Sequence, residues 1–235
     1  MELFKYITPY GVACSDEVDI TDFVSQIQGK VDFQISFPES VTSITFHYEE
    51  GTPAYKYSWM DNLWQGLYPF GDYANLQPIE PYVLNFGSEV EEAYLRLMSG
   101  GFSWGETNTD NAAEFYEATH DININGNTEF QQHLWQSCNP NPAECQPQNG
   151  TWYYNRHGWC PGSIPILFRY DLSPWLSFND VELQYEFYSG YVDLCHPNHP
   201  DCQTGVTCSN CNDTWNPEIH VAGELVTFSN EIIIT

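Results

Sequence analysis

Basic residues are scarce in this chain: six Lys and Arg stand against 32 Asp and Glu, for a formal net charge of −26. A surface of this sign repels a phosphate backbone, which excludes nucleic acid as a partner. Binding to an anionic membrane surface is disfavoured for the same reason. The charge balance therefore predicts neither a nucleic-acid-binding protein nor one that docks on an anionic membrane.

Long apolar runs are missing as well. No stretch of about 18 apolar residues occurs, so the sequence predicts no membrane span. The seven His form no His-His or His-x-His pair and only three Met occur, which argues against a copper site. We expect no cofactor.

Cysteine, in contrast, is abundant. Eight Cys indicate an oxidising compartment, and the sequons at Asn149 and Asn212 fit an extracellular or cell-surface chain. The first residues, Met1 to Tyr6, lack the apolar region of a signal peptide. We therefore expect a fragment, a processed chain, or a numbering that begins inside a longer protein.

Alternating polar and apolar residues run through much of the sequence, and aromatics reach 16%. A period of two predicts strands with one buried face, clearest at 30–37, 44–48 and 182–187. Further candidate strands lie at 3–8, 82–86, 93–98, 120–125, 164–170 and 219–228. Residues 21–27 and 112–118 are each expected to form a short helix or a turn.

Short strands separated by Gly, Pro, Asn and Asp are typical of an antiparallel sandwich or jelly roll. The sequence therefore predicts an all-β fold. A boundary falls near Gly51-Thr52-Pro53, where the strand pattern stops. We expect residues from about 54 to 235 to form one complete jelly roll.

A Gly-, Pro- and Cys-rich turn, Asn155 to Gly162, encloses Arg156 and Trp159. Five other segments precede it in a fixed order: Tyr6 to Tyr10, Val18 to Phe23, Glu50 to Pro53, Glu92 to Arg96, and Ala113 to Phe115 followed by Thr119-His120. Together, from about Phe4 to Tyr188, they resemble the peptide-N-glycosidase F family, secreted amidases that cut N-linked glycans from asparagine.

The resemblance implies two stacked jelly rolls. Residues 1–53 would be the later strands of the first roll, incomplete alone, and 54–235 the second roll. Such strands would leave open edges, so we expect an upstream segment or a neighbouring subunit to complete the first roll. The Cys-rich insertion at 189–217 departs from the family.

The family's chemistry needs a carboxylate that activates or orients water and a proton for the leaving nitrogen. Its main aspartate lies in a Trp-Asp-Arg stretch, and this triplet does not occur in residues 1–235. By resemblance, Glu114 matches a catalytic glutamate and Glu39 a further carboxylate, with its register off by one. Arg156 matches the family's arginine, which either grips sugar hydroxyls or braces the turn.

Aromatic and cysteine positions complete the implied site. A sugar-stacking tryptophan of the family falls at Phe102, with Trp104 close by, and Trp159 in the Arg156 turn is also expected to bind substrate. Cys138 and Cys160 match a family disulfide. A cysteine pair that flanks the family's glutamate is replaced here by Ala112 and Tyr116.

Two motifs allow a metal interpretation. Cys195, Cys202, Cys208 and Cys211, with intervening His, could ligate zinc, but an oxidising compartment favours two local disulfides. Asp121 to Gly126 resembles the start of an EF-hand loop, although position twelve is Gln132; an Asn-Gly turn in a hairpin explains the same residues. We expect no metal.

Two functions remain open. One is an N-glycan amidase acting on glycoproteins, completed by residues outside this chain. The other is a non-catalytic module that binds glycans or builds a surface assembly. In either, exposed aromatic rings could stack on sugars.

Overall fold

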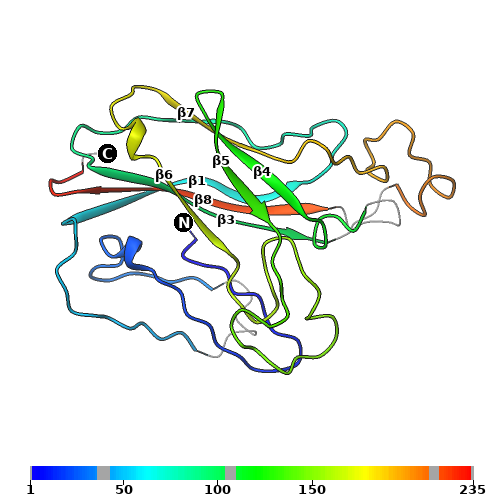
Figure 1. Cartoon of the computed structure of the whole chain (residues 1–235), viewed down its shortest axis with the longest axis horizontal. Helices are drawn as coiled ribbons and strands as arrows, with labels where there is room; N and C mark the ends of the chain where they lie inside the picture. Colours follow the sequence, from blue (N-terminus) through cyan, green and yellow to red (C-terminus); the bar gives the residue numbers. More distant parts are fainter. Residues whose placement is uncertain (1, 36–42, 104–109, 212–216, 234–235) are drawn as a thin grey trace.

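The computed structural model describes residues 2–35, 43–103, 110–211 and 217–233. Eight strands and two short 3₁₀ turns occur in these ranges (Figure 1). In chain order they are η1 (Thr21–Phe23), β1 (Tyr57–Pro69), β2 (Tyr82–Leu84), β3 (Glu92–Phe102), β4 (Ala118–Ile124), β5 (Asn127–Leu134), β6 (Leu167–Asp171), η3 (Ser173–Trp175), β7 (Val181–Glu186) and β8 (Glu218–Ser229).

The strands form two four-stranded antiparallel sheets, ordered β1-β8-β3-β6 and β2-β7-β4-β5. The sheets face each other across one apolar core, to which Leu95, Ile122, Leu183 and Val221 each contribute a fully buried side chain. This is a jelly-roll sandwich, so the prediction of an all-β fold is confirmed.

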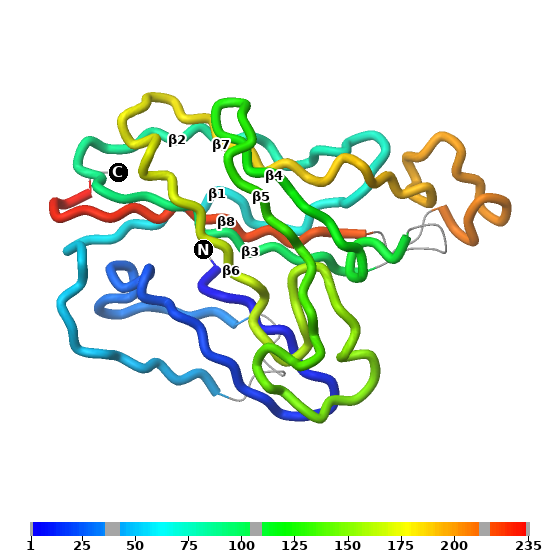
Figure 2. The backbone as a smooth tube through the Cα atoms, in the orientation of Figure 1, coloured from blue at the N-terminus to red at the C-terminus, as the bar shows by residue number. Residues whose placement is uncertain are grey.

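Strand β3 is buried on both faces. Ala93, Leu95 and Leu97 point into the core between the sheets, and alternation places Tyr94 and Arg96 on the outer face. A second apolar cluster on that outer face joins Tyr94 to Phe23 of the N-terminal segment. Described residues 2–35 and 43–56 thus lie along the outside of this sheet (Figure 2).

That N-terminal segment corrects part of the sequence prediction. Described residues 2–35 and 43–56 contain no strand, although strands were expected at 3–8, 30–37 and 44–48. Alternation predicts which face is buried, but a strand also needs a neighbour to pair with. Ile7 shows pairing of that kind, since its N–H donates to Ser163 O and its carbonyl accepts from Gly162 N, and the Tyr10 carbonyl accepts from Asn149 N. These isolated bonds do not make a strand. Residues 21–23 form the expected short helical turn.

The sequence did not predict strand β1, and it left two interpretations of Asp121 to Gly126 open. Strand β1 was missed because a register shift between Asn62 and Trp64 breaks its alternation. Asn125 and Gly126, with φ of 50° and 78°, form the two-residue turn of the β4–β5 hairpin. The hairpin interpretation of Asp121 to Gly126 is therefore the one the fold adopts.

Candidate active site

The fold brings Glu114 and Arg156 together. Glu114 lies in the turn between β3 and β4, and Arg156 in the long loop between β5 and β6. Arg156 Nε donates to Glu114 Oε1 at 3.0 Å. The two positions that the family resemblance singled out, 42 residues apart, are thus one ion pair.

Arg156 uses all of its donors inside the protein. Its side chain is fully buried. Besides Glu114, its terminal nitrogens donate to the carbonyls of Trp152 (3.2 Å), Tyr154 (2.7 Å) and Thr151 (2.9 Å), with the Thr151 hydroxyl at 3.5 Å. A guanidinium has five N–H groups, so none remains for a sugar. Of the two roles left open for Arg156, the geometry favours bracing the turn.

Glu114 is held firmly by its backbone. Its N–H donates to Ser103 O at 3.0 Å, and its carbonyl accepts from His157 N at 2.9 Å. The side chain keeps 13% exposure. Burial raises the pKa of the Glu114 carboxyl above its usual value, and Arg156 opposes this only in part. A positioned carboxyl that retains its proton more readily suits a proton donor.

Packing replaces the cysteine pair that the family places beside its glutamate. Ala112 is fully buried. The ring of Tyr116 lies 5.0 Å from that of Tyr191 and 5.9 Å from that of Phe70, between ring centroids. Phe70 and Tyr191 are themselves stacked at 4.9 Å. Three aromatic rings therefore support the Glu114 turn without a covalent bond.

Trp159 and Phe102 form a stacked pair, with centroids 5.3 Å apart. Trp159 is 4% exposed and its indole N–H donates to Gly101 O at 2.6 Å. The Lys5 ammonium lies 4.4 Å from the centre of the Phe102 ring. Trp159 thus supports Phe102 from inside the protein, in contrast to the direct sugar contact that the resemblance implied for it.

A buried polar network next to Glu114 was not found from the sequence. His120 Nδ1 and Gln132 Oε1 each lie 2.7 Å from the Tyr185 hydroxyl. The ring of His157, whose Nδ1 contacts Tyr116 O at 2.5 Å, lies 5.5 Å from that of His120. Both histidines are fully buried. Both histidines belong to motifs of the family resemblance: His120 to Thr119-His120 and His157 to the Arg156 turn. The spacing of these motifs did not predict that the two rings lie close together.

Two predicted residues lie outside the described part of the chain: Glu39 and Trp104. The cysteines lie within it. Disulfides join Cys138 to Cys160, the pair that the resemblance implied, and Cys14 to Cys145. Together they tie the long β5–β6 loop to itself and to the N-terminal segment.

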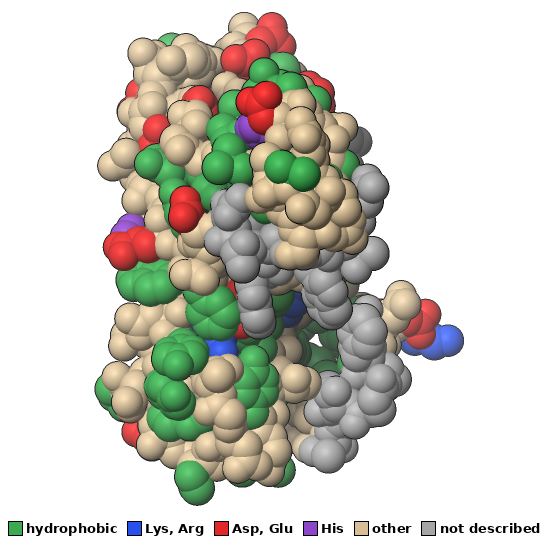
Figure 3. Space-filling view, turned by 90° about the vertical axis from the view of Figure 1, so that its right-hand side faces the viewer, with side chains coloured by type: hydrophobic (Ala, Val, Ile, Leu, Met, Phe, Trp, Pro, Cys, Tyr) green, Lys and Arg blue, Asp and Glu red, His purple; other side chains and the backbone are tan. Residues whose placement is uncertain are grey.

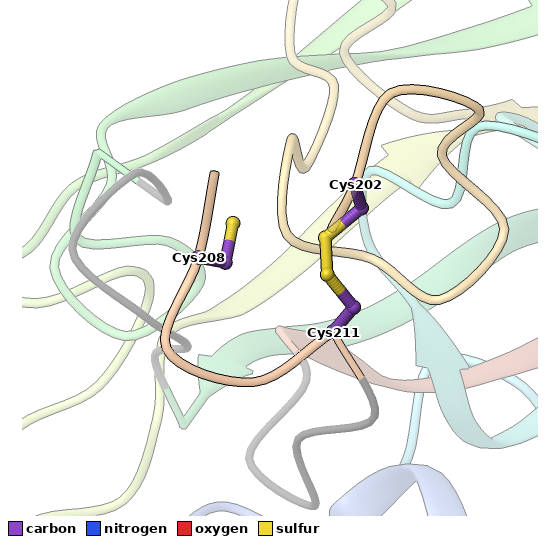
Figure 4. A group of neighbouring side chains, drawn as sticks. All are labelled: Cys202, Cys208 and Cys211. Atoms are coloured by element: carbon purple, nitrogen blue, oxygen red, sulfur yellow. A yellow bond between two sulfur atoms is a disulfide. The ribbon is translucent and has the colours of Figure 1, made fainter. Parts of the chain in front are cut away.

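The Cys-rich insertion contains two further disulfides, Cys195–Cys208 and Cys202–Cys211. The sulfur atoms of Cys202, Cys208 and Cys211 lie within 4.8 Å of one another (Figure 4). Zinc requires thiolates, and these three sulfurs are all engaged in disulfides. The insertion is thus stapled covalently, as an oxidising compartment favours.

Comparisons with known proteins identify the sequence family of the chain. Residues 72–207 match the family model described as peptide-N-glycosidase F, C terminal. The chain is 31% identical over 212 residues to the peptide-N(4)-(N-acetyl-beta-D-glucosaminyl)asparagine amidase F of Elizabethkingia miricola. That match covers 80% of this chain but 58% of the relative, so the chain spans little more than half of the relative's length.

Solved structures give the same fold. A recombinant peptide:N-glycanase F superposes with a TM-score of 0.62 at 24% identity, over 79% of this chain and 56% of that one. The glycosylasparaginase PNGase F of Flavobacterium meningosepticum superposes with a TM-score of 0.62 at 25% identity over the same shares. Among the described residues, no helix is long and apolar enough to cross a membrane.

Proposed function

The chain belongs to the peptide-N-glycosidase F family, and from this we propose that it contributes the Glu114 half of an N-glycan amidase site. The reaction is hydrolysis of the amide between asparagine and N-acetylglucosamine. Glu114 supplies a proton to the leaving nitrogen or orients water, because burial raises its pKa while leaving its carboxyl partly exposed. Arg156 holds that carboxyl in place.

The observation that carries this proposal is the Glu114–Arg156 pair at 3.0 Å. The carboxyl has one fixed orientation, and the turn around it is supported from both sides. A fixed donor lowers the entropic cost of reaching the transition state. A surface glutamate with no functional constraint would need none of this support.

The rest of the site is proposed to come from residues outside this chain. The relative from Elizabethkingia miricola is longer, and the Trp-Asp-Arg triplet does not occur in residues 1–235. We propose that an upstream segment of the same protein, or a neighbouring subunit, completes the first jelly roll and supplies the main aspartate. The eight disulfide-bonded cysteines support an extracellular or cell-surface setting.

A second function rests on Arg156. Because Arg156 makes all of its hydrogen bonds within the protein, it braces the Glu114 carboxyl and has no donor left to grip a sugar. That arrangement supports a non-catalytic glycan-binding module as the alternative. The two functions differ in whether any form of the protein releases a glycan.

The test uses an N-glycopeptide and the purified chain, alone and fused to the part of the Elizabethkingia miricola amidase that the chain does not match. We expect negligible release by the chain alone, since each general acid or base typically contributes about 10²–10⁴-fold. We expect release by the fusion, and a loss of about 10²-fold or more in Glu114→Gln.

Glu129→Gln is the matched control, because Glu129 is an exposed carboxylate on β5. It should leave release unchanged. Glycan release by the fusion that survives Glu114→Gln would rule out the role of Glu114. A fusion that folds and binds the glycopeptide but never releases glycan would establish the binding module instead.

A further inference from the structure

Three consecutive aromatic residues border the Glu114 turn. Tyr153 and Tyr154 are 45% and 49% exposed, and their ring centroids lie 4.6 Å apart. Tyr154 meets Phe115, the residue after Glu114, edge-on at 6.2 Å, and Trp152 meets Tyr153 at 6.0 Å. The end of the molecule that carries this loop faces the viewer in Figure 3, where hydrophobic side chains gather on the lower lobe.

This aromatic surface is rigid although it lies on a loop. The same guanidinium that holds Glu114 also binds the carbonyls of Thr151, Trp152 and Tyr154. Tyr154 N donates to Thr151 O at 3.2 Å, which closes the turn. A surface fixed before binding loses little entropy when a ligand arrives.

Further contacts stabilise the loop from below. Asn141 Nδ2 and Gln148 Nε2 both donate to Pro161 O, at 2.7 and 2.9 Å. The two disulfides at Cys138 and Cys145 fasten the loop to Cys160 and to Cys14. Hydrogen bonds and two disulfides therefore fix the backbone of the loop that carries the aromatic rings.

The loop is also nearly free of charge. Residues 136–155 contain one acidic residue, Glu144, and no Lys or Arg, in a chain whose net charge is −26. Amide side chains take their place: Gln136, Asn139, Asn141, Gln146, Gln148, Asn149 and Asn155. Amides and tyrosines can hydrogen-bond a ligand without requiring it to carry charge.

We propose that Tyr153 and Tyr154 form a stacking platform for uncharged pyranose rings of a glycan whose asparagine-linked end lies at Glu114. Rigid aromatic rings offer apolar faces to the C–H side of a sugar, and their hydroxyls bond its rim. This inference rests on the proposed function and extends it. It assigns sugar binding to residues that the family resemblance did not single out, and it selects neutral sugars over charged ones.

The experiment measures binding by the chain of a glycopeptide that carries two N-acetylglucosamine residues on asparagine, using NMR titration. The bare peptide serves as the ligand control. Tyr153→Ala and Tyr154→Ala are compared with Tyr82→Ala, which removes a ring of similar exposure (40%) on β2, far from the β5–β6 loop (Figure 2). Near-UV circular dichroism verifies that each variant is folded.

We expect the glycopeptide to bind, the bare peptide not to bind, and each platform variant to raise Kd roughly fivefold or more, as the loss of one aromatic contact predicts. Tyr82→Ala should leave Kd unchanged. Binding that Glu114→Gln weakens but both platform variants leave intact would overturn the platform and spare the proposed function. No glycopeptide binding by the chain would overturn the platform, whereas the proposed function is decided separately by glycan release from the fusion.

A second copy of the chain is the other possible occupant of the platform. If the platform joins two copies of this chain, light scattering will show an oligomer that Tyr153→Ala and Tyr154→Ala convert to monomers. That outcome overturns the proposal. A wild-type chain that binds the glycopeptide through these rings, and whose oligomeric state neither variant changes, supports it.

Discussion

The guanidinium of Arg156 connects two parts of the surface that would otherwise move independently. One of its nitrogens fixes the Glu114 carboxyl, and the other two fix the carbonyls beneath Tyr153 and Tyr154. Lysine, with one point of charge, could not make this set of bonds. A buried arginine with every donor satisfied is therefore a positioning residue for both the Glu114 carboxyl and the aromatic surface.

The buried histidines give a prediction about pH. An unfolded histidine titrates near pH 6.5, and burial lowers the pKa of His157 in the folded protein to about 4, against the opposing bond to Tyr116 O. As the pH falls between these values, the unfolded state takes up the proton first. The free energy of unfolding therefore falls with pH from about 6.5 toward 4, by at most about 1.4 kcal/mol per pH unit for this residue.

His157→Gln removes that contribution while keeping an amide that can bond Tyr116 O. We expect its denaturant midpoints to depend less steeply on pH between 6.5 and 4 than those of the wild type. His47→Gln, at an exposed site, should follow the wild type. The raised pKa of Glu114 has the opposite effect, because it increases the free energy of unfolding as the pH falls. This contribution is common to the wild type and both variants. Parallel curves for His157→Gln and wild type would refute the assignment.

At the scale of the elements, a buried ion pair on the sheet formed by β1, β8, β3 and β6 holds the N-terminal segment against its outer face. Arg96 on β3 lies opposite Glu224 on β8, and their side chains meet at 3.0 Å with 1% and 0% exposure. Arg96 also donates to Leu3 O at 2.6 Å and lies 4.9 Å from the Phe23 ring centre. The pair therefore anchors the N-terminal segment to the sandwich.

Removing one partner of this pair should be costly. Arg96→Met leaves a buried carboxylate unpaired, which typically costs about 3–5 kcal/mol. The double variant Arg96→Met/Glu224→Leu should recover part of that loss, because no buried charge remains. Denaturant unfolding measures both.

An exposed pair provides the control. Glu117 and His133 are each 56% exposed, so Glu117→Gln should change the free energy of unfolding by less than about 1 kcal/mol. If Arg96→Met costs no more than Glu117→Gln, the pair does not anchor the segment.

The elements also show how far the sequence could be read. Strand β7 was predictable because it alternates without interruption, and the candidate strands at 93–98 and 219–228 fall on β3 and β8, which are buried on both faces. Motifs that resemble a known family singled out Glu114 and Arg156 separately, but not their pairing. Strand β1 was hidden by its register shift. The meeting of His120 with His157, and the exposed position of Tyr153 and Tyr154, depend on how the β5–β6 loop folds back, which no local pattern encodes.

At the scale of the whole molecule, some apolar side chains of the N-terminal segment are buried against the sandwich and others are exposed to solvent. Phe23 is 1% exposed where it packs against the outer face of the sheet. Farther along, Phe33, Ile35 and Ile44 remain 46%, 41% and 41% exposed, and Tyr48 remains 77% exposed. Phe33 and Phe46 already meet, with ring centroids 5.0 Å apart. Two extended apolar stretches therefore lie together without a sheet.

An exposed apolar surface of this kind usually marks an interface. We expect the chain of residues 1–235 to associate at micromolar concentration through this surface, because extended backbone beside apolar side chains favours the addition of strands. Light scattering measures the association. Phe33→Ser combined with Ile44→Ser should shift the chain toward the monomer. Val206→Ser, which changes a residue 77% exposed in the Cys-rich insertion, should not. A wild-type chain that stays monomeric and binds no added strand-forming segment would show that the sandwich of β1 to β8 and residues 1–50 need no partner.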